Sequence, residues 1–200
     1  PKKEKSPVLV TGADGYVAGV LVRELLQLGL TVHATVILPP SKLQYLQEIA
    51  DASPGTIRFF TANLLDQGAF VEAMKGCRVV FHTASPFAMN ATIDPQRDLV
   101  DPAVKGTANV LLTAKETKTV QRVVQTSSVG AIYADASDTY SAPKNTLTEA
   151  IWNTTSTLTH QPYFLSKTLA EKKAWEIANS QEQWKLVTIN PSLILGQGLR

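Results

Sequence analysis

Short apolar runs alternate with longer amphipathic stretches along the whole chain. The runs predict strands over Val8–Val10, Thr31–Ile37, Ile57–Phe60, Arg78–His82, Val120–Thr126 and Trp184–Asn190. The stretches between them predict helices over Gly15–Leu28, Ser41–Ile49, Asp66–Lys75, Pro102–Lys118 and Pro162–Ser180. Residues 127–161 are polar and follow no periodic pattern. Strands that alternate with helices indicate an α/β fold built on a doubly wound parallel sheet.

For three of these helices, the sequence also predicts the role of individual side chains. The apolar stripe of the first helix is expected to comprise Leu21, Leu25 and Leu28. Ser41 is expected to cap the second helix. In the last helix, neighbouring acidic and basic residues indicate a solvated face made of Glu171, Lys172 and Lys173.

Composition excludes several classes of function. The formal net charge is only +2 and there is no long basic run, so a nucleic-acid partner is not expected. No apolar run approaches 18 residues and no signal peptide pattern precedes the first strand, so we expect a cytoplasmic protein without a membrane partner. The single cysteine, Cys77, excludes an internal disulfide, and no residues have metal-ligand spacing.

The length of 200 residues suits one well-cored domain, or one domain and part of another. We expect residues 1–6 to form a flexible tail and residues 7–200 to form a single dinucleotide-binding domain that carries the catalytic residues. Such sheets bind ligands in a crevice at the strand ends, and this domain alone would form only one side of it. The substrate domain is therefore expected to lie largely outside these residues.

A glycine turn follows the first predicted strand, in the order Thr11-Gly12-x-x-Gly15-x-x-Ala18. Glycine at the second and fifth of these positions permits a tight turn and lets a phosphate approach the main chain. The helix that begins there directs its N–H groups and its positive dipole end toward that phosphate. Between a strand and a helix, this pattern favours dinucleotide binding.

Two further motifs carry chemistry. Tyr163 and Lys167 are four residues apart, so a helix places both on one face. An ammonium beside a phenol is expected to lower the tyrosine pKa and suit it to act as a general acid. Thr126-Ser127-Ser128 ends the fifth strand, where a hydroxyl could hold a substrate carbonyl oxygen while a nicotinamide supplies hydride to the carbon.

The order of these three motifs resembles the extended short-chain dehydrogenase/reductases. Further stretches resemble the branch that contains dihydroflavonol reductases, cinnamoyl-CoA reductases and microbial aldehyde and ketone reductases. These stretches are Thr31–Val36, Val80–Pro86, Pro102–Thr107, Thr126–Tyr133 and Ile189–Pro191. The resemblance implies a Rossmann-type sheet.

The resemblance also implies roles for individual residues. The catalytic set is Ser128, preferred over Ser127, with Tyr163 and Lys167. Lys167 would also hold the nicotinamide ribose. The other implied cofactor contacts are Thr11, Gly12, Gly15, Tyr16 and Val17 at the pyrophosphate, Asn63 and Leu64 near the adenine, Thr83, Ala84 and Ser85 along the cofactor, and Pro191 and Leu193 near the nicotinamide amide. Phe87 and Met89 could form a wall of the substrate pocket or simply cover a loop.

The choice of cofactor depends on the end of the second strand. This branch usually has an arginine and an aspartate there, whereas this chain has Ile37 and Leu38. Lys42 remains as a positive charge for a 2′-phosphate, and no acidic residue ends the strand to bind a 2′-hydroxyl. We therefore expect NADP rather than NAD.

The expected function is reduction of an aldehyde, ketone or related small-molecule carbonyl by a monomer or homodimer. One alternative is reduction of a CoA thioester, although residues 158–162 lack the Asn-Trp-Tyr-Cys-Tyr signature of the plant enzymes. A second is a sugar-nucleotide epimerase or dehydratase of the same fold. A non-enzymatic dinucleotide sensor is disfavoured by the intact Tyr163 and Lys167.

Overall fold

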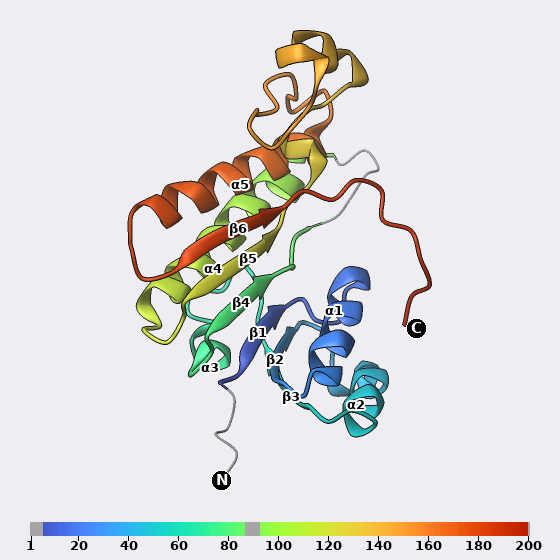
Figure 1. Ribbon diagram of the computed structural model, residues 1–200, viewed down its shortest axis with the longest axis vertical. Coiled ribbons are helices and arrows are strands. Elements are labelled where there is room, and N and C mark those ends of the chain that lie inside the picture. The colour runs from blue at the N-terminus through green and yellow to red at the C-terminus, as the bar shows by residue number, and fades with distance from the viewer. Residues whose placement is uncertain (1–5, 87–92, 200) are drawn as a thin grey trace.

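The protein, described here from a computed structural model over residues 6–86 and 93–199, is built around one parallel sheet (Figure 1). Its strands are β1 (Val8–Thr11), β2 (Thr31–Val36), β3 (Thr56–Thr61), β4 (Val79–His82), β5 (Arg122–Thr126) and β6 (Lys185–Ile189). They lie in the order β3-β2-β1-β4-β5-β6, and every neighbouring pair is parallel. The predicted doubly wound sheet is confirmed. Its order reverses between β1 and β4, which is where such sheets bind ligands.

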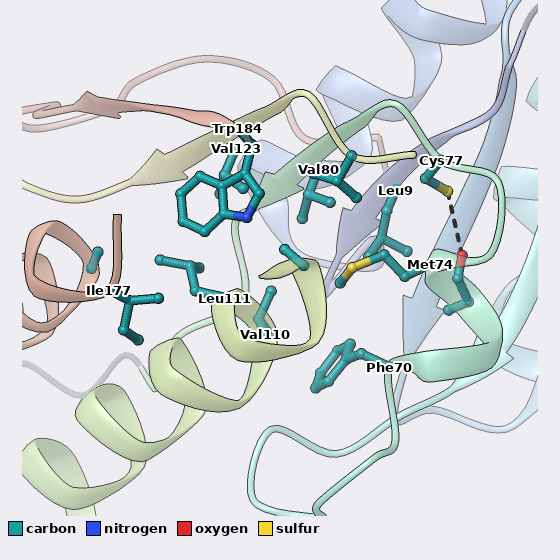
Figure 2. Close-up of a cluster of buried hydrophobic side chains, with 14 of the residues drawn as sticks. Leu9, Phe70, Met74, Cys77, Val80, Val110, Leu111, Val123, Ile177 and Trp184 are labelled. Carbon is teal, nitrogen blue, oxygen red and sulfur yellow. Dashed lines mark hydrogen bonds between the residues drawn. The ribbon is translucent and has the colours of Figure 1, made fainter. Parts of the chain in front are cut away.

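Helices cover both faces of the sheet. They are α1 (Tyr16–Gln27), α2 (Gln44–Asp51), α3 (Val71–Met74), α4 (Asp101–Glu116) and α5 (Pro162–Asn179). In β1, Val8 and Val10 point into a core shared with α1 and α2, whereas Leu9 points into a core shared with α3, α4 and α5. Figure 2 shows the second core, in which Trp184 lies close to Val123. Because the central strand β1 is buried on both faces, its apolar residues do not alternate with polar ones.

The first helix is amphipathic, but its buried stripe differs from the expected one. The buried residues are Ala18, Gly19, Val22, Leu25 and Leu26. Leu28 is 68% exposed, because α1 ends at Gln27 and Leu28 lies beyond its last turn. The expectation for Leu28 was therefore wrong.

Two other predicted helices have different bounds from those expected. The stretch Asp66–Lys75 forms a helix only over Val71–Met74, because Gly68 adopts a left-handed φ of 76° and the residues before it form turns. Ser41 does not cap α2: it lies in a 3₁₀ turn over Pro40–Lys42, and Leu43 is the N-cap residue.

The long stretch between β5 and α5 has little regular structure, as expected. It contains the 3₁₀ turns η3 (Val129–Ala131), η4 (Ala136–Ser141) and η5 (Pro143–Asn145). A π-helical turn, η2 (Gln96–Val100), leads into α4. Most of the stretch extends beyond the sheet near the start of α5 (Figure 1). Among the helices in the described ranges, none is both long and apolar enough to cross a membrane.

Candidate active site

The turn between β1 and α1 has no room for side chains at its two glycines. Gly12 has a φ of +62°, and a Cβ there would lie 3.0 Å from the Cβ of Ala84. A Cβ on Gly15 would lie 3.1 Å from the Gly12 carbonyl oxygen, which already accepts the Gly15 N–H at 2.9 Å. Gly15 is also the N-cap of α1 and provides no side-chain hydrogen bond. The first N–H groups of α1 are thus suited to an anion such as a phosphate.

Thr11 connects this turn to the loop after β4. Its fully buried Oγ1 accepts the N–H groups of Thr83, at 3.1 Å, and Ala84, at 3.0 Å. Its own hydroxyl hydrogen therefore serves the third contact, to Nδ1 of His82 at 3.0 Å. The Thr11 hydroxyl is therefore engaged in contacts within the protein.

His82 is a buried neutral group. Burial lowers the pKa of His82 to about 3. Because Nδ1 accepts from Thr11, we assign the proton to Nε2, which lies 3.4 Å from Oγ1 of Thr107 on α4. The histidine thus joins the glycine turn to α4 and packs as a structural residue.

Three further predicted cofactor contacts are Thr83, Asn63 and Leu64. Thr83 Oγ1 is buried and has no hydrogen-bond partner within residues 6–86 and 93–199, so it could accept or donate a hydrogen bond to a bound molecule. Asn63 is exposed, and its Oδ1 accepts the N–H of Leu65 at 3.0 Å. Leu64 packs against Gly106 of α4, where a Cβ would approach it to 3.0 Å. Both the Thr83 hydroxyl, which has no partner among the described residues, and the turn that contains Gly12 and Gly15 fit a bound dinucleotide.

Other predicted contacts are spread more widely. The Pro191 carbonyl accepts the N–H of Val129 at 3.0 Å, whereas Leu193 is 80% exposed. Lys42 is exposed near the end of β2. A cavity of about 170 Å³ adjoins the glycine turn, and its lining includes Gly15 and Tyr16. Phe87 and Met89 lie outside the described residues, as do residues 1–5 of the predicted tail.

A close contact with α5 positions the serine at the end of β5. Ser128 is buried, and its Oγ accepts the N–H of Gly130 at 3.0 Å. A Cβ on Gly130 would lie only 2.6 Å from Cδ1 of Phe164, and the Gly130 carbonyl accepts the Thr168 hydroxyl at 3.1 Å. The loop that begins with Ser128 therefore packs directly on the first turns of the helix that carries Tyr163. Gly130 was not singled out from the sequence, because nothing local indicates which side chain will cover it.

Tyr163 and Lys167 lie on one face of α5, as their spacing predicted. The Lys167 ammonium lies over the Tyr163 ring, 5.8 Å from its centroid. Burial lowers the pKa of Lys167 to about 8, and the charge of Glu171 partly offsets this effect. Burial raises the pKa of Tyr163, which corrects the expectation of a lowered value. Removing the phenolate from water outweighs attraction by an ammonium at this distance, so Tyr163 is protonated at neutral pH.

Glu171 is not part of a solvated helix face. Its side chain is buried, whereas Lys172 is exposed and lies over the Trp152 ring, 5.3 Å from the centroid. The expectation was wrong for Glu171 because its position on α5 faces the ends of β5 and β6. The sequence did contain a sign of this burial, because Glu171 is four residues after Lys167 and therefore lies on the same face of the helix.

No group of three His, Cys, Asp or Glu side chains that could hold a metal ion occurs in the described part of the chain. The donors at this edge are instead hydroxyl, amide and ammonium groups, together with backbone N–H groups.

Comparison with known proteins shows the family. Residues 8–200 match the NAD dependent epimerase/dehydratase family. The chain is a member of this family. Its relatives include the extended short-chain reductases that the sequence motifs resembled, so that interpretation is confirmed.

Two plant reductases and one yeast structure illustrate the likeness of this family member to known proteins. The chain is 41% identical to cinnamoyl-CoA reductase CAD2 of Medicago truncatula over 194 residues, which cover 94% of the chain and 58% of that protein. It is 37% identical to dihydroflavonol 4-reductase of Zea mays over 195 residues, 96% of the chain and 54% of that protein. The crystal structure of Gre2 from Candida albicans in complex with NADPH superposes with a TM-score of 0.82 at 32% identity, over 96% of the chain and 59% of Gre2. The chain thus spans somewhat over half the length of these relatives.

Proposed function

We propose that this protein is an NADP(H)-dependent reductase that converts an aldehyde, a ketone or a related carbonyl group to an alcohol. The observation that carries the proposal is the packing of the Ser128 loop on α5 through Gly130. This packing gathers a buried serine, a protonated tyrosine and a buried lysine at one end of the sheet. Relatives that match 94% and 96% of the chain are reductases by name.

Each side chain has a role that follows from its environment. Ser128 Oγ accepts the Gly130 N–H, which leaves its own O–H to donate to a substrate carbonyl oxygen. Tyr163 is protonated at neutral pH and would donate its proton to the same oxygen. Lys167 would stabilise the phenolate that remains and bind the ribose hydroxyls. The bound nicotinamide would supply the hydride, while Gly12, Gly15 and the N-terminus of α1 hold the pyrophosphate.

The preference for NADP rests on Lys42. This exposed lysine follows β2, and the strand ends in Val36 without an acidic residue to bind a ribose 2′-hydroxyl. The Candida albicans relative and a yeast methylglyoxal/isovaleraldehyde reductase have both been solved with NADPH.

Reduction of a CoA thioester is a second candidate, because a cinnamoyl-CoA reductase is 41% identical to this chain. The absence of the plant signature in residues 158–162 favours simpler carbonyl compounds. Epimerase or dehydratase chemistry on a sugar nucleotide would use the same tyrosine and lysine, but it would regenerate a tightly retained cofactor.

The test is an assay of the full-length protein with NADPH and NADH against aldehydes, ketones, aromatic acyl-CoA esters and nucleotide sugars. Tyr163→Phe should reduce turnover at least 10²-fold and leave the Kd for NADPH within about threefold, because the phenol acts in proton transfer. Tyr140→Phe is the matched control, since Tyr140 is 83% exposed. Undiminished turnover in Tyr163→Phe would refute the proposed mechanism.

A further inference from the structure

A buried carboxylate lies beneath the candidate catalytic residues. Glu171 is 6% exposed and lies one helical turn after Lys167 on α5. Its Oε2 accepts the Ser127 hydroxyl and, at 2.9 Å, the side-chain amide of Asn190. Its Oε1 accepts the indole N–H of Trp175 at 3.3 Å. Burying a carboxylate is costly unless its oxygens are hydrogen-bonded, and these three donors meet that need.

These contacts join the ends of two strands to the helix. Ser127 directly follows β5, and Asn190 directly follows β6. The Asn190 amide also donates to the carbonyl oxygen of Ser128, at 3.0 Å. Glu171 therefore contacts the residue before Ser128 directly and the backbone of Ser128 through one intervening amide. Two sets of contacts therefore hold Ser128 in place: this hydrogen-bond network and the packing of Gly130 on Phe164.

The same carboxylate also acts on Lys167. Lys167 is 7% exposed, so its ammonium has lost most of its hydration. Glu171 supplies the attraction that opposes this loss. Within the described residues, the other titratable groups that interact with Lys167 are Tyr163 on the same helix and His82 at the end of β4, and burial keeps both of them neutral at pH 7. Glu171 is thus the neighbouring anion for a buried cation.

We propose that Glu171 is a positioning residue of the active site, which holds the Ser127–Ser128 strand end in place and keeps the buried Lys167 charged. The proposal rests on the proposed function in taking Ser128 and Lys167 as catalytic groups. It goes beyond that function by assigning a role to a side chain that touches neither substrate nor cofactor. If Glu171 only filled space, its charge would not matter to Lys167.

The charge is tested with Glu171→Gln in the full-length protein. The pH titration of Lys167 is followed directly by NMR through its ¹³Cε resonance in protein labelled with ¹³C-lysine, and the resonance is assigned by its absence from Lys167→Met. We expect the Lys167 pKa to fall by at least 0.5 units below its wild-type value, because burial is then unopposed. The alkaline limb of the kcat/KM profile should move by the same amount. An unchanged titration overturns the charge part of the proposal.

Glu176→Gln is the matched control. Glu176 is also on α5, but it is exposed and paired with Lys173 at 2.5 Å, so the same loss of charge occurs away from Lys167. The Lys167 titration should be unchanged in this variant. An equal shift in both variants would show that net charge, rather than Glu171, sets the Lys167 pKa.

The positioning part is tested with Ser127→Ala, which keeps the Glu171 charge and remains informative if Glu171→Gln does not fold. We expect kcat to fall at least fivefold, with the Kd for NADPH and the Lys167 titration unchanged. An unaltered kcat overturns this part. If the protein reduces no carbonyl compound, the kcat measurements fail together with the proposed function, while the NMR titration still decides whether Glu171 acts on Lys167.

Discussion

A single methyl group added at Gly130 should displace the candidate catalytic serine. In Gly130→Ala, the new Cβ would lie 2.6 Å from Cδ1, 2.7 Å from Cγ and 3.0 Å from Cβ of Phe164. Carbon atoms in contact are normally about 3.5–4.0 Å apart, so the loop and the helix must separate by roughly 1 Å. The clash includes the Phe164 Cβ, so a rotation of the ring about its own bonds does not relieve it completely.

The separation has two measurable consequences. Overpacking of this kind costs about 1–3 kcal/mol of stability, and a domain of this size loses about 2–4 °C in Tm per kcal/mol. Moving Ser128 by about 1 Å relative to Tyr163 should lower kcat/KM by roughly 10²-fold. Thermal unfolding and steady-state kinetics of the full-length protein measure both effects.

Gly68→Ala separates loss of stability from loss of geometry. Gly68 has a φ of +76° with nothing within 4 Å of an added Cβ, so alanine there strains the backbone by about 1 kcal/mol without a clash. Its Tm should fall while kcat/KM stays near the wild-type value. Phe164→Ala in the Gly130→Ala background should restore part of the activity, because it removes Cδ1 and Cγ, the two atoms that the new Cβ approaches most closely. Full activity in Gly130→Ala, or no rescue by the second substitution, would refute the reasoning.

Three further predictions concern single side chains. Burial holds the pKa of His82 at about 3, against 6.5 in the unfolded chain, so its contribution to stability is complete above pH 6.5 and is lost as the pH falls toward 3. Urea unfolding should therefore show the wild type losing roughly 4 kcal/mol more than His82→Gln between pH 7 and pH 3; equal losses would contradict this. Lys42→Ala should raise the KM for NADPH about tenfold and leave that for NADH unchanged, since a charge-assisted contact to the 2′-phosphate is lost; parallel changes would place the 2′-phosphate elsewhere. Burial raises the pKa of the Cys77 thiol to about 12, so iodoacetamide at pH 8 should label Cys77 only after unfolding, as measured by peptide mass spectrometry. Rapid labelling of the native protein would show that Cys77 is accessible.

The sequence alone determined the features that depend on neighbouring residues. Period and length separate strands from helices, so the parallel sheet was predictable. The pair Gly12 and Gly15 marks the turn because backbone conformation there depends on the absence of a side chain. Tyr163 and Lys167 were predictable as a pair because helical geometry alone places residues four apart on one face.

Tertiary structure decided what each side chain touches. Glu171 and Lys172 are adjacent charged residues with the same local preferences, yet one is buried against the ends of β5 and β6 and the other is exposed. Gly130 packs against Phe164, which is 34 residues away in sequence. The Thr11 hydroxyl binds a loop more than 70 residues away. The pKa of Tyr163 rises because burial outweighs the nearby ammonium, and burial is set by the packing of the whole domain. Local sequence encodes backbone conformation, whereas burial and charge environment arise only when distant segments pack together.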